Sequence, residues 1–142
     1  MSKKKKKGAI EIEEAELIPI KNKYPDRDYR IDIELPEFTC LCPVTGYPDF
    51  AVINVHYIPD EYIVELKSLK LYINKFRNQG MYHEAAVNRI MDDIVEKIDP
   101  RWIKVVGDFN RRGNVKTIVT AEHNSEKLSK RGISIARRPE PK

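Results

Sequence analysis

The apolar residues of this chain change their period twice, and this change constrains the fold more than any other feature of the sequence. In the segment 30–35 they alternate with polar residues, as expected for a half-buried strand. In the segment 64–80 they recur every three or four residues over much of its length, which indicates an amphipathic helix. Similar patterns predict further elements: a strand at 49–58, a helix at 82–98, and strands at 102–109 and 115–121.

The predicted order is strand, strand, helix, helix, strand, strand, so we expect an α+β fold with antiparallel hairpins. The 142 residues fit one ordinary domain. We assign 29–122 to this domain, 1–28 to an irregular basic arm, and 123–142 to a basic tail that we expect to be mobile. Four strands leave sheet edges exposed, and oligomerisation into a larger closed sheet is one remedy.

The net charge of +4 does not describe the predicted domain. Lys3 to Lys7 are five consecutive lysines, and 124–142 hold six basic and two acidic residues. The segment 9–123 has 15 basic and 20 acidic residues, so the basicity lies in the two ends. A nucleic-acid-binding domain more often carries positive charge on its folded surface. We interpret the ends as solvated tails, although lysines can bind RNA weakly by charge alone.

The composition predicts a soluble protein of the cytoplasm. No apolar run approaches the ~20 residues that a membrane-spanning helix needs. The lysine run near the N-terminus is followed by no apolar core, so we expect no secretory signal. Two cysteines do not form a disulfide framework, and a reducing compartment is the simplest expectation.

The stretch TCLCPVTGYPDF, residues 39–50, holds both cysteines and an acid. Cys40 and Cys42 can be read as a metal clip, a disulfide, two buried small side chains, or a nucleophile and its neighbour. A zinc site needs three or four ligands, and the three histidines show no zinc-binding spacing around the pair. A disulfide between residues two apart would close a very small ring, so it is a poor structural element.

Local chemistry favours a reactive Cys42 without excluding a buried, inert one. Pro43 holds Cys42 extended, and the following turn leads into a strand that opens with Asp49. A chain that turns back in this way can bring Cys42 and Asp49 together. A thiolate with a carboxyl group nearby suits nucleophilic addition followed by proton transfer.

Polar residues also gather where the two predicted helices begin. The first helix carries Glu65, Lys67, Ser68 and Lys70 near its start. Such a face can bind phosphates, although most basic faces are merely solvated. His83 and Glu84 start the second helix. An acid there is an ordinary preference, but a carboxylate can also accept two N–H donors from the edge of a guanine-like ring.

Taken together, three blocks resemble a known enzyme family. The blocks are FTCLCPVTGYPDFA, VELKSLKLYINKFRNQGMYHE and DPRWIKVVGDFNRRG, within about 30–113. They are similar to the NADPH-dependent 7-cyano-7-deazaguanine reductases of the short, single-module type, which are nitrile reductases of queuosine biosynthesis, a tRNA modification. The resemblance implies the tunnelling fold of GTP cyclohydrolase I, with two helices on one face of an antiparallel sheet. It further implies a homo-oligomer with active sites between subunits, no metal, and no need for a membrane or direct nucleic-acid partner.

The resemblance also assigns roles to individual residues. Cys42 would attack the nitrile carbon and form a covalent thioimide, and Asp49 would donate a proton to the nitrile nitrogen. The residues implied in substrate binding are Val64, Glu65, Leu66, His83 and Glu84. The residues implied in binding NADPH, the co-substrate, are Lys67, Ser68, Lys70 and Arg112. The chain has no Gly-x-Gly-x-x-Gly sequence, so we expect no Rossmann domain.

Two other functions remain as alternatives. One is another tunnelling-fold enzyme that acts on a pterin or GTP, for which a zinc-dependent member should show more cysteine and histidine ligands. The other is a non-catalytic RNA-associated module that uses the basic ends. Cys40 stands where the resemblance would place serine or another small residue, and it could be neutral or a redox partner of Cys42.

Overall fold

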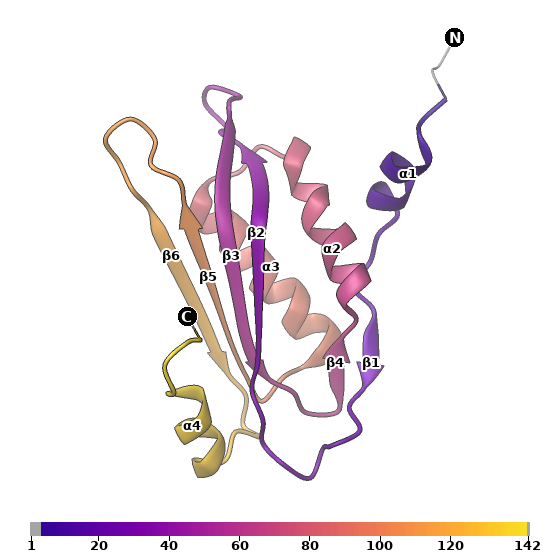
Figure 1. The fold of residues 1–142 in the computed structure, drawn as a ribbon, viewed down its shortest axis with the longest axis vertical. Coiled ribbons are helices and arrows are strands. Elements are labelled where there is room, and N and C mark those ends of the chain that lie inside the picture. The colour runs from indigo at the N-terminus through magenta and orange to yellow at the C-terminus, as the bar shows by residue number, and fades with distance from the viewer. Residues whose placement is uncertain (1–3, 142) are drawn as a thin grey trace.

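The computed structural model describes residues 4–141, so Lys3, the first residue of the lysine run, lies outside the described residues. The main sheet has four antiparallel strands in the order β2-β3-β5-β6 (Figure 1). Their bounds are Ile31–Leu41 for β2, Pro48–Ile58 for β3, Trp102–Phe109 for β5 and Ile118–Asn124 for β6. The predicted α+β class and the predicted order of these four strands along the chain are therefore confirmed.

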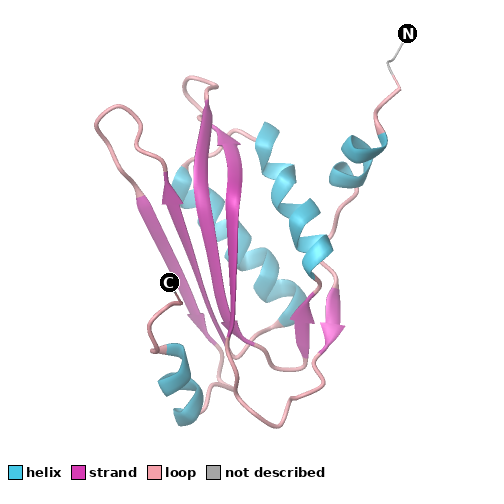
Figure 2. Cartoon of the chain, in the orientation of Figure 1, coloured by secondary structure: helices cyan, strands magenta, loops and turns pink. Residues whose placement is uncertain are grey.

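Two long helical segments cover one face of this sheet (Figure 2). The first is α2, Leu66–Asn74, which continues into the 3₁₀ turn η1, Lys75–Asn78. The second is α3, His83–Ile98. Both helices carry an apolar stripe, and burying that stripe against the sheet removes apolar surface from water, which is the main stabilising term.

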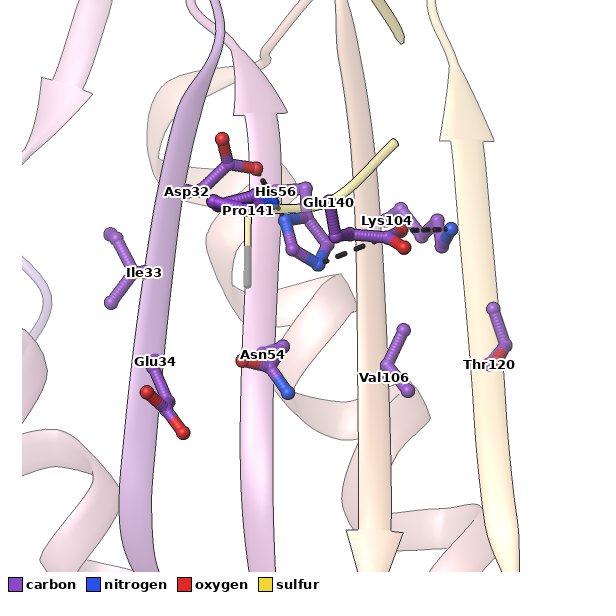
Figure 3. A pocket seen from close by; sticks show the side chains of 10 residues that line it. All are labelled: Asp32, Ile33, Glu34, Asn54, His56, Lys104, Val106, Thr120, Glu140 and Pro141. Carbon is purple, nitrogen blue, oxygen red and sulfur yellow. Dashed lines mark hydrogen bonds and ion pairs between the residues drawn. The ribbon is translucent and has the colours of Figure 1, made fainter. Parts of the chain in front are cut away.

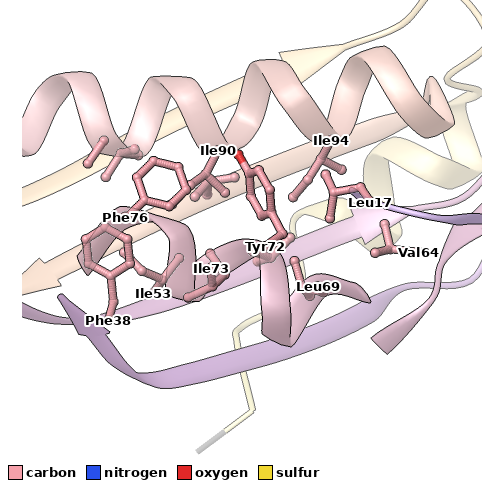
Figure 4. Packing of buried hydrophobic residues seen from close by; sticks show 14 of the residues in the cluster. Leu17, Phe38, Ile53, Val64, Leu69, Tyr72, Ile73, Phe76, Ile90 and Ile94 are labelled. Carbon is pink, nitrogen blue, oxygen red and sulfur yellow. The ribbon is translucent and has the colours of Figure 1, made fainter. Parts of the chain in front are cut away.

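The core lies between these helices and the sheet (Figure 4). Ile90 and Ile94 of α3 are fully buried there, as is Ile53 of β3. Gly107 of β5 marks the closest approach, because a Cβ atom at this position would lie 2.5 Å from Cγ2 of Val87. A glycine is therefore required for α3 to pack this closely on β5.

Several predicted boundaries are wrong. β2 runs on to Leu41 instead of ending at Leu35, since a register shift between Leu35 and Phe38 interrupts the alternation. Pro36 lies within this shift and cannot donate a ladder hydrogen bond. The first helix loses its α-helical hydrogen bonding after Asn74, and its last turn is the 3₁₀ segment η1.

The last strand begins three residues later than predicted, at Ile118. Val115 belongs to the β5–β6 turn, where its backbone exchanges hydrogen bonds of 3.0 and 3.1 Å with Arg112. The alternating pattern around Val115 is therefore a property of the turn and not of the sheet.

Regular structure also occurs in the segment expected to be an irregular arm. It contains α1, Lys7–Glu13, and β1, Pro19–Lys21, which pairs antiparallel with β4, Tyr62–Val64. Arg101 ties the arm to the domain, because its guanidinium donates hydrogen bonds of 3.0 Å to Asp28 and 2.9 Å to Asp60.

The C-terminal segment likewise contains a helix, α4, Lys130–Ala136. Its N-cap is Ser129, whose hydroxyl accepts a hydrogen bond from the backbone of Gly132 at 3.0 Å. Ile135 packs in a small cluster with Ile58 and Trp102. Both terminal segments are thus partly structured, and their division from the domain stays a prediction.

Candidate active site

Three chain segments meet at one end of the sheet: the β2–β3 loop, the start of α3 and the β5–β6 turn (Figure 1). Backbone hydrogen bonds fix their relative positions. The end of β2 is joined to the segment before α3, because Leu41 accepts from Met81 at 3.0 Å and donates to Gln79 at 2.9 Å. The β5–β6 turn is joined to β3 by a 2.8 Å bond from Asn110 to Phe50.

Cys42 lies directly after β2, in a tight turn. Its N–H donates to Tyr47 and its carbonyl accepts from Gly46, both at 2.8 Å. The pKa of the Cys42 thiol lies below its ordinary value, chiefly because the Thr45 hydroxyl can donate to the thiolate. The backbone N–H groups of Thr45 and Val44 and the charge of Arg112 add to this effect. The turn therefore stabilises a thiolate at the surface of the protein.

Cys40 has the opposite character. Its side chain is fully buried, in the hydrophobic core. Burial raises the pKa of the Cys40 thiol to about 11, and the nearby Asp49 and Cys42 add to the shift. Both cysteines are free. The structure thus separates a thiol suited to ionisation from one that remains protonated.

Asp49 is in register with Cys40 on the neighbouring strand, so it lies beside the cysteine pair. Only 8% of its surface is exposed. Its Oδ1 accepts a hydrogen bond from Nη1 of Arg112, and its Oδ2 lies 3.3 Å from Nε2 of His83. The expected return of the chain from Cys42 to Asp49 is therefore present, and Arg112 is part of the same cluster.

His83 is the first residue of α3 and is held by a ring stack. Its imidazole lies parallel to the Phe109 ring, at 3.8 Å between centroids and with 4° between planes. Glu84 follows it in the first turn of α3 and is exposed to solvent. The carboxylate of Glu84 is therefore available at the same end of the molecule as Cys42 and Asp49.

The residues around the start of α2 lie at the opposite end of the fold (Figure 1). They are Val64, Glu65, Leu66, Lys67, Ser68 and, one turn further on, Lys70. The nine residues of α2 and the four of η1 separate Glu65 from Gly80, which pairs with Leu41 beside Cys42. At about 1.5 Å and 2.0 Å per residue, the separation is roughly 20 Å.

Glu65 and Ser68 are occupied by the helix itself. Glu65 is the N-cap of α2, where its carboxylate accepts hydrogen bonds from the backbone of Lys67 at 2.9 Å and Ser68 at 2.6 Å. These bonds lower the pKa of the Glu65 carboxyl group. The Ser68 hydroxyl is buried and accepts from the backbone of Ile18 at 3.0 Å. The predicted contact of Ser68 with a cofactor phosphate has no support from this position.

The other four residues at the start of α2 differ in their exposure to solvent. Val64 is buried, whereas Leu66 is 64% exposed and Lys67 and Lys70 are exposed. The two ammonium groups could therefore bind the phosphates of a dinucleotide. An exposed leucine beside them gives an apolar surface that a second molecule could cover.

A separate cavity lies on the face of the sheet that the helices leave open (Figure 3). His56 is buried there, with Nδ1 2.5 Å from Oδ1 of Asp32. Glu140 reaches the cavity from the C-terminal segment and accepts a 2.5 Å hydrogen bond from Lys104. Each of these charged groups has a partner, and the cluster contains no residue predicted for the site.

Among the described residues, no group of three or more His, Cys, Asp and Glu side chains could hold a metal ion. None of the described helices is long and apolar enough to cross a membrane.

Comparisons with known proteins agree with these observations. The model of the family described as QueF-like protein matches residues 48–128, more than half of the chain. The chain belongs to the QueF-like family. Two relatives are both named NADPH-dependent 7-cyano-7-deazaguanine reductase. The one from Aquifex aeolicus is 59% identical over 83% of this chain and 92% of its own. The one from Anaeromyxobacter sp. strain Fw109-5 is 63% identical over 72% of this chain and 84% of its own. The resemblance stated from the sequence is thereby confirmed.

The fold has a solved counterpart. The crystal structure of the archaeosine synthase QueF-Like in the apo form matches with a TM-score of 0.60 and 19% identity. The match covers 69% of this chain and 94% of the other. At this identity the likeness concerns the fold alone, and it supports the predicted tunnelling fold.

Sequence reasoning missed three residues of the candidate site. Thr45 stabilises the Cys42 thiolate, Tyr47 lies under the Arg112 guanidinium at 5.6 Å, and Phe109 stacks on His83. A hydroxyl residue three positions after a cysteine in a turn could have indicated Thr45. No sequence signal brings Phe109 to His83, because they belong to different elements.

Proposed function

We propose that this chain reduces the nitrile of 7-cyano-7-deazaguanine to the aminomethyl group of 7-aminomethyl-7-deazaguanine, with NADPH as reductant. The observation that carries this proposal is the pairing of a stabilised thiolate at Cys42 with a buried carboxyl group at Asp49. The family membership and the names of the relatives support the same reaction. The product would serve queuosine biosynthesis in the cytoplasm.

The first chemical step would be covalent. The Cys42 thiolate adds to the nitrile carbon, one carbon–nitrogen π bond breaks, and the nitrogen takes a proton from the Asp49 carboxyl group. The product is a thioimide on Cys42 and a carboxylate on Asp49. A nucleophile stabilised by hydrogen bonds and a positioned acid are the two groups that this addition needs.

NADPH would supply the hydrides that take the thioimide, and then the imine released from Cys42, to the amine. Lys67 and Lys70 would hold its phosphates, since both ammonium groups are exposed on one helix. Arg112 is the remaining predicted phosphate contact, and its partner in this structure is Asp49.

His83 and Glu84 would bind the deazaguanine ring. A carboxylate matches the two neighbouring N–H donors on the edge of such a ring. Glu84 is free to make this contact because it is exposed in the first turn of α3. The Phe109 stack would keep His83 in place beside Asp49 while the ring binds.

A complete site would require two copies of the chain. Cys42 and the start of α2 are at opposite ends of the fold and cannot serve one substrate molecule within a single copy. A homo-oligomer that places the α2 start of one copy against the β2–β3 loop of the next would join them. The exposed Leu66 and the exposed Val44 of that loop would then become buried.

The test is NADPH oxidation by the purified protein with 7-cyano-7-deazaguanine, followed by absorbance. We expect oxidation that depends on the nitrile and yields the aminomethyl product by mass spectrometry. Well-folded protein that shows no turnover would refute the proposal. Stoichiometric zinc in the purified protein would instead favour a pterin- or GTP-processing enzyme.

A further inference from the structure

Both oxygens of the Asp49 carboxyl group already have nitrogen partners in this structure. Oδ1 accepts a hydrogen bond from Arg112, and Oδ2 lies 3.3 Å from Nε2 of His83. The carboxyl group is also almost fully buried, so it cannot turn to a new direction freely. A group that must pass a proton to a nitrile nitrogen has to present one oxygen to the substrate, and one partner must therefore leave.

His83 is the more firmly held of the two partners. Its ring is stacked on Phe109, and it starts a helix of 16 residues that has one face buried in the core along its whole length. Arg112 belongs to the exposed β5–β6 turn, and 40% of its side chain is accessible to solvent. Its other contact is with the face of the Tyr47 ring, at 5.6 Å. Arg112 is therefore the partner that can move without disturbing the fold.

The Arg112 guanidinium also lies near the nucleophile, because its charge helps to lower the pKa of the Cys42 thiol. One side chain of the β5–β6 turn is therefore within reach of both groups of the proposed addition, and its hydrogen bond is made to Oδ1 of Asp49.

The geometry points to Arg112 as a positioning residue that covers Oδ1 of Asp49 until an anionic cofactor draws the guanidinium away. An exposed guanidinium on a turn can exchange a carboxylate for a phosphate, which it can bind with two parallel hydrogen bonds. Departure of Arg112 uncovers Oδ1, so that this oxygen can face the substrate. Binding of the phosphates is thereby coupled to the access of Asp49 to the nitrile nitrogen, and this inference rests on the proposed function.

The experiment measures the rate of thioimide formation on Cys42 by intact mass, with 7-cyano-7-deazaguanine and without NADPH. Adenosine 2′,5′-bisphosphate serves as the probe, because it carries phosphates but no hydride. For the unmodified chain we expect the probe to accelerate adduct formation by about tenfold, the order of the cost of breaking one charge-assisted hydrogen bond.

Arg112→Ala removes the guanidinium, and we expect adduct formation that does not respond to the probe. Arg112→Lys keeps a cation and should retain a slower, probe-sensitive reaction, which a loss of folding would not produce. Arg111→Ala is the matched control, because Arg111 is exposed in the same turn, and it should behave like the unmodified chain.

Two results are decisive in different ways. If the probe does not change the rate at which the unmodified chain forms the adduct, or if it accelerates Arg112→Ala to the same extent, the role of Arg112 is overturned while the proposed function stands. If no adduct forms in any variant, the proposed function itself fails.

Discussion

The two ends of the sheet both carry polar residues but use them differently. At the β2–β3 end, Cys42 from the turn after β2 and Asp49 from β3 meet groups from two further segments. At the α2 end, Glu65 and Ser68 are engaged by backbone N–H groups, those of Lys67 and Ser68 for Glu65 and that of Ile18 for Ser68. A motif of polar residues therefore does not by itself form a site, since hydrogen bonding decides which side chains remain available for a ligand.

The β2–β3 end and the α2 end also differ in the chemistry that each can perform alone. The β2–β3 end holds a nucleophile and an acid, which are sufficient for covalent addition. The α2 end adds exposed cations, which suit phosphate binding. Under the proposed two-copy site, reduction needs both ends, and they come from different copies.

The largest expected effect is recovery of activity when two inactive variants are mixed. Cys42→Ala removes the nucleophile at one end, and Lys67→Ala removes a phosphate contact at the other. After joint refolding, about a quarter of the sites in a random mixed oligomer should combine two intact ends. NADPH oxidation measures the recovery. A mixture that stays as inactive as its components would mean that both ends act within one copy.

A second prediction concerns the β2–β3 end alone. Thr45→Val removes the hydroxyl that contributes most to the lowered pKa of Cys42, so the pKa should rise and the thiolate fraction at pH 7 should fall. We expect alkylation by iodoacetamide to slow by about three- to tenfold, with the pH profile moved upward.

Lys67→Ala is the control for this experiment, because it alters only the α2 end. It should leave the alkylation rate unchanged while it impairs reduction. Equal slowing in both variants would contradict the separation of the two ends.

A third prediction tests the structural use of Glu65. Glu65→Ala removes the N-cap of α2 and should lower Tm by about 4 °C. Glu84→Ala, at an exposed position of the first turn of α3, should change Tm by less than about half as much and mainly weaken substrate binding. Thermal unfolding followed by circular dichroism gives both values. Equal losses would show that Glu65 has no special part in the helix.

The smallest expected effect is a pH-dependent contribution at the α2 end. Burial favours a higher pKa for Asp60, but hydrogen bonds from Lys127 and Arg101 outweigh it and leave the pKa below its ordinary value. Because the folded-state pKa is the lower one, the stabilisation is present above about pH 4 and is lost as the pH falls through the folded-state pKa.

Asp60→Asn should accordingly lower Tm by about 2 °C at pH 7, and the difference from the unmodified chain should shrink toward pH 3. Melting curves across this range check the sign. A difference that grows in acid would contradict the assigned ion pairs.

The sequence predicts the central elements because their apolar periods are strong. Both predicted ends of β5 match the structure, and the predicted ends of β3 and α3 are within one residue of it. Prediction from the sequence failed where a local feature interrupts the apolar period, as at the bulge before Phe38. It also failed where a short element depends on tertiary contacts, as α4 does through Ile135. The proximity of Cys42 and Asp49 could be predicted from the turn between them. The contact between Arg112 and Asp49 could not be predicted, because these residues are 63 positions apart in the sequence.

The most direct test of the account is the site of covalent attachment. The unmodified chain and Cys40→Ala are incubated with 7-cyano-7-deazaguanine without NADPH, and each adduct is located by peptide mass mapping. The account predicts one adduct per chain, on Cys42, in both proteins and none in Cys42→Ala. An adduct on Cys40, or its persistence in Cys42→Ala, would contradict the assignment of the nucleophile.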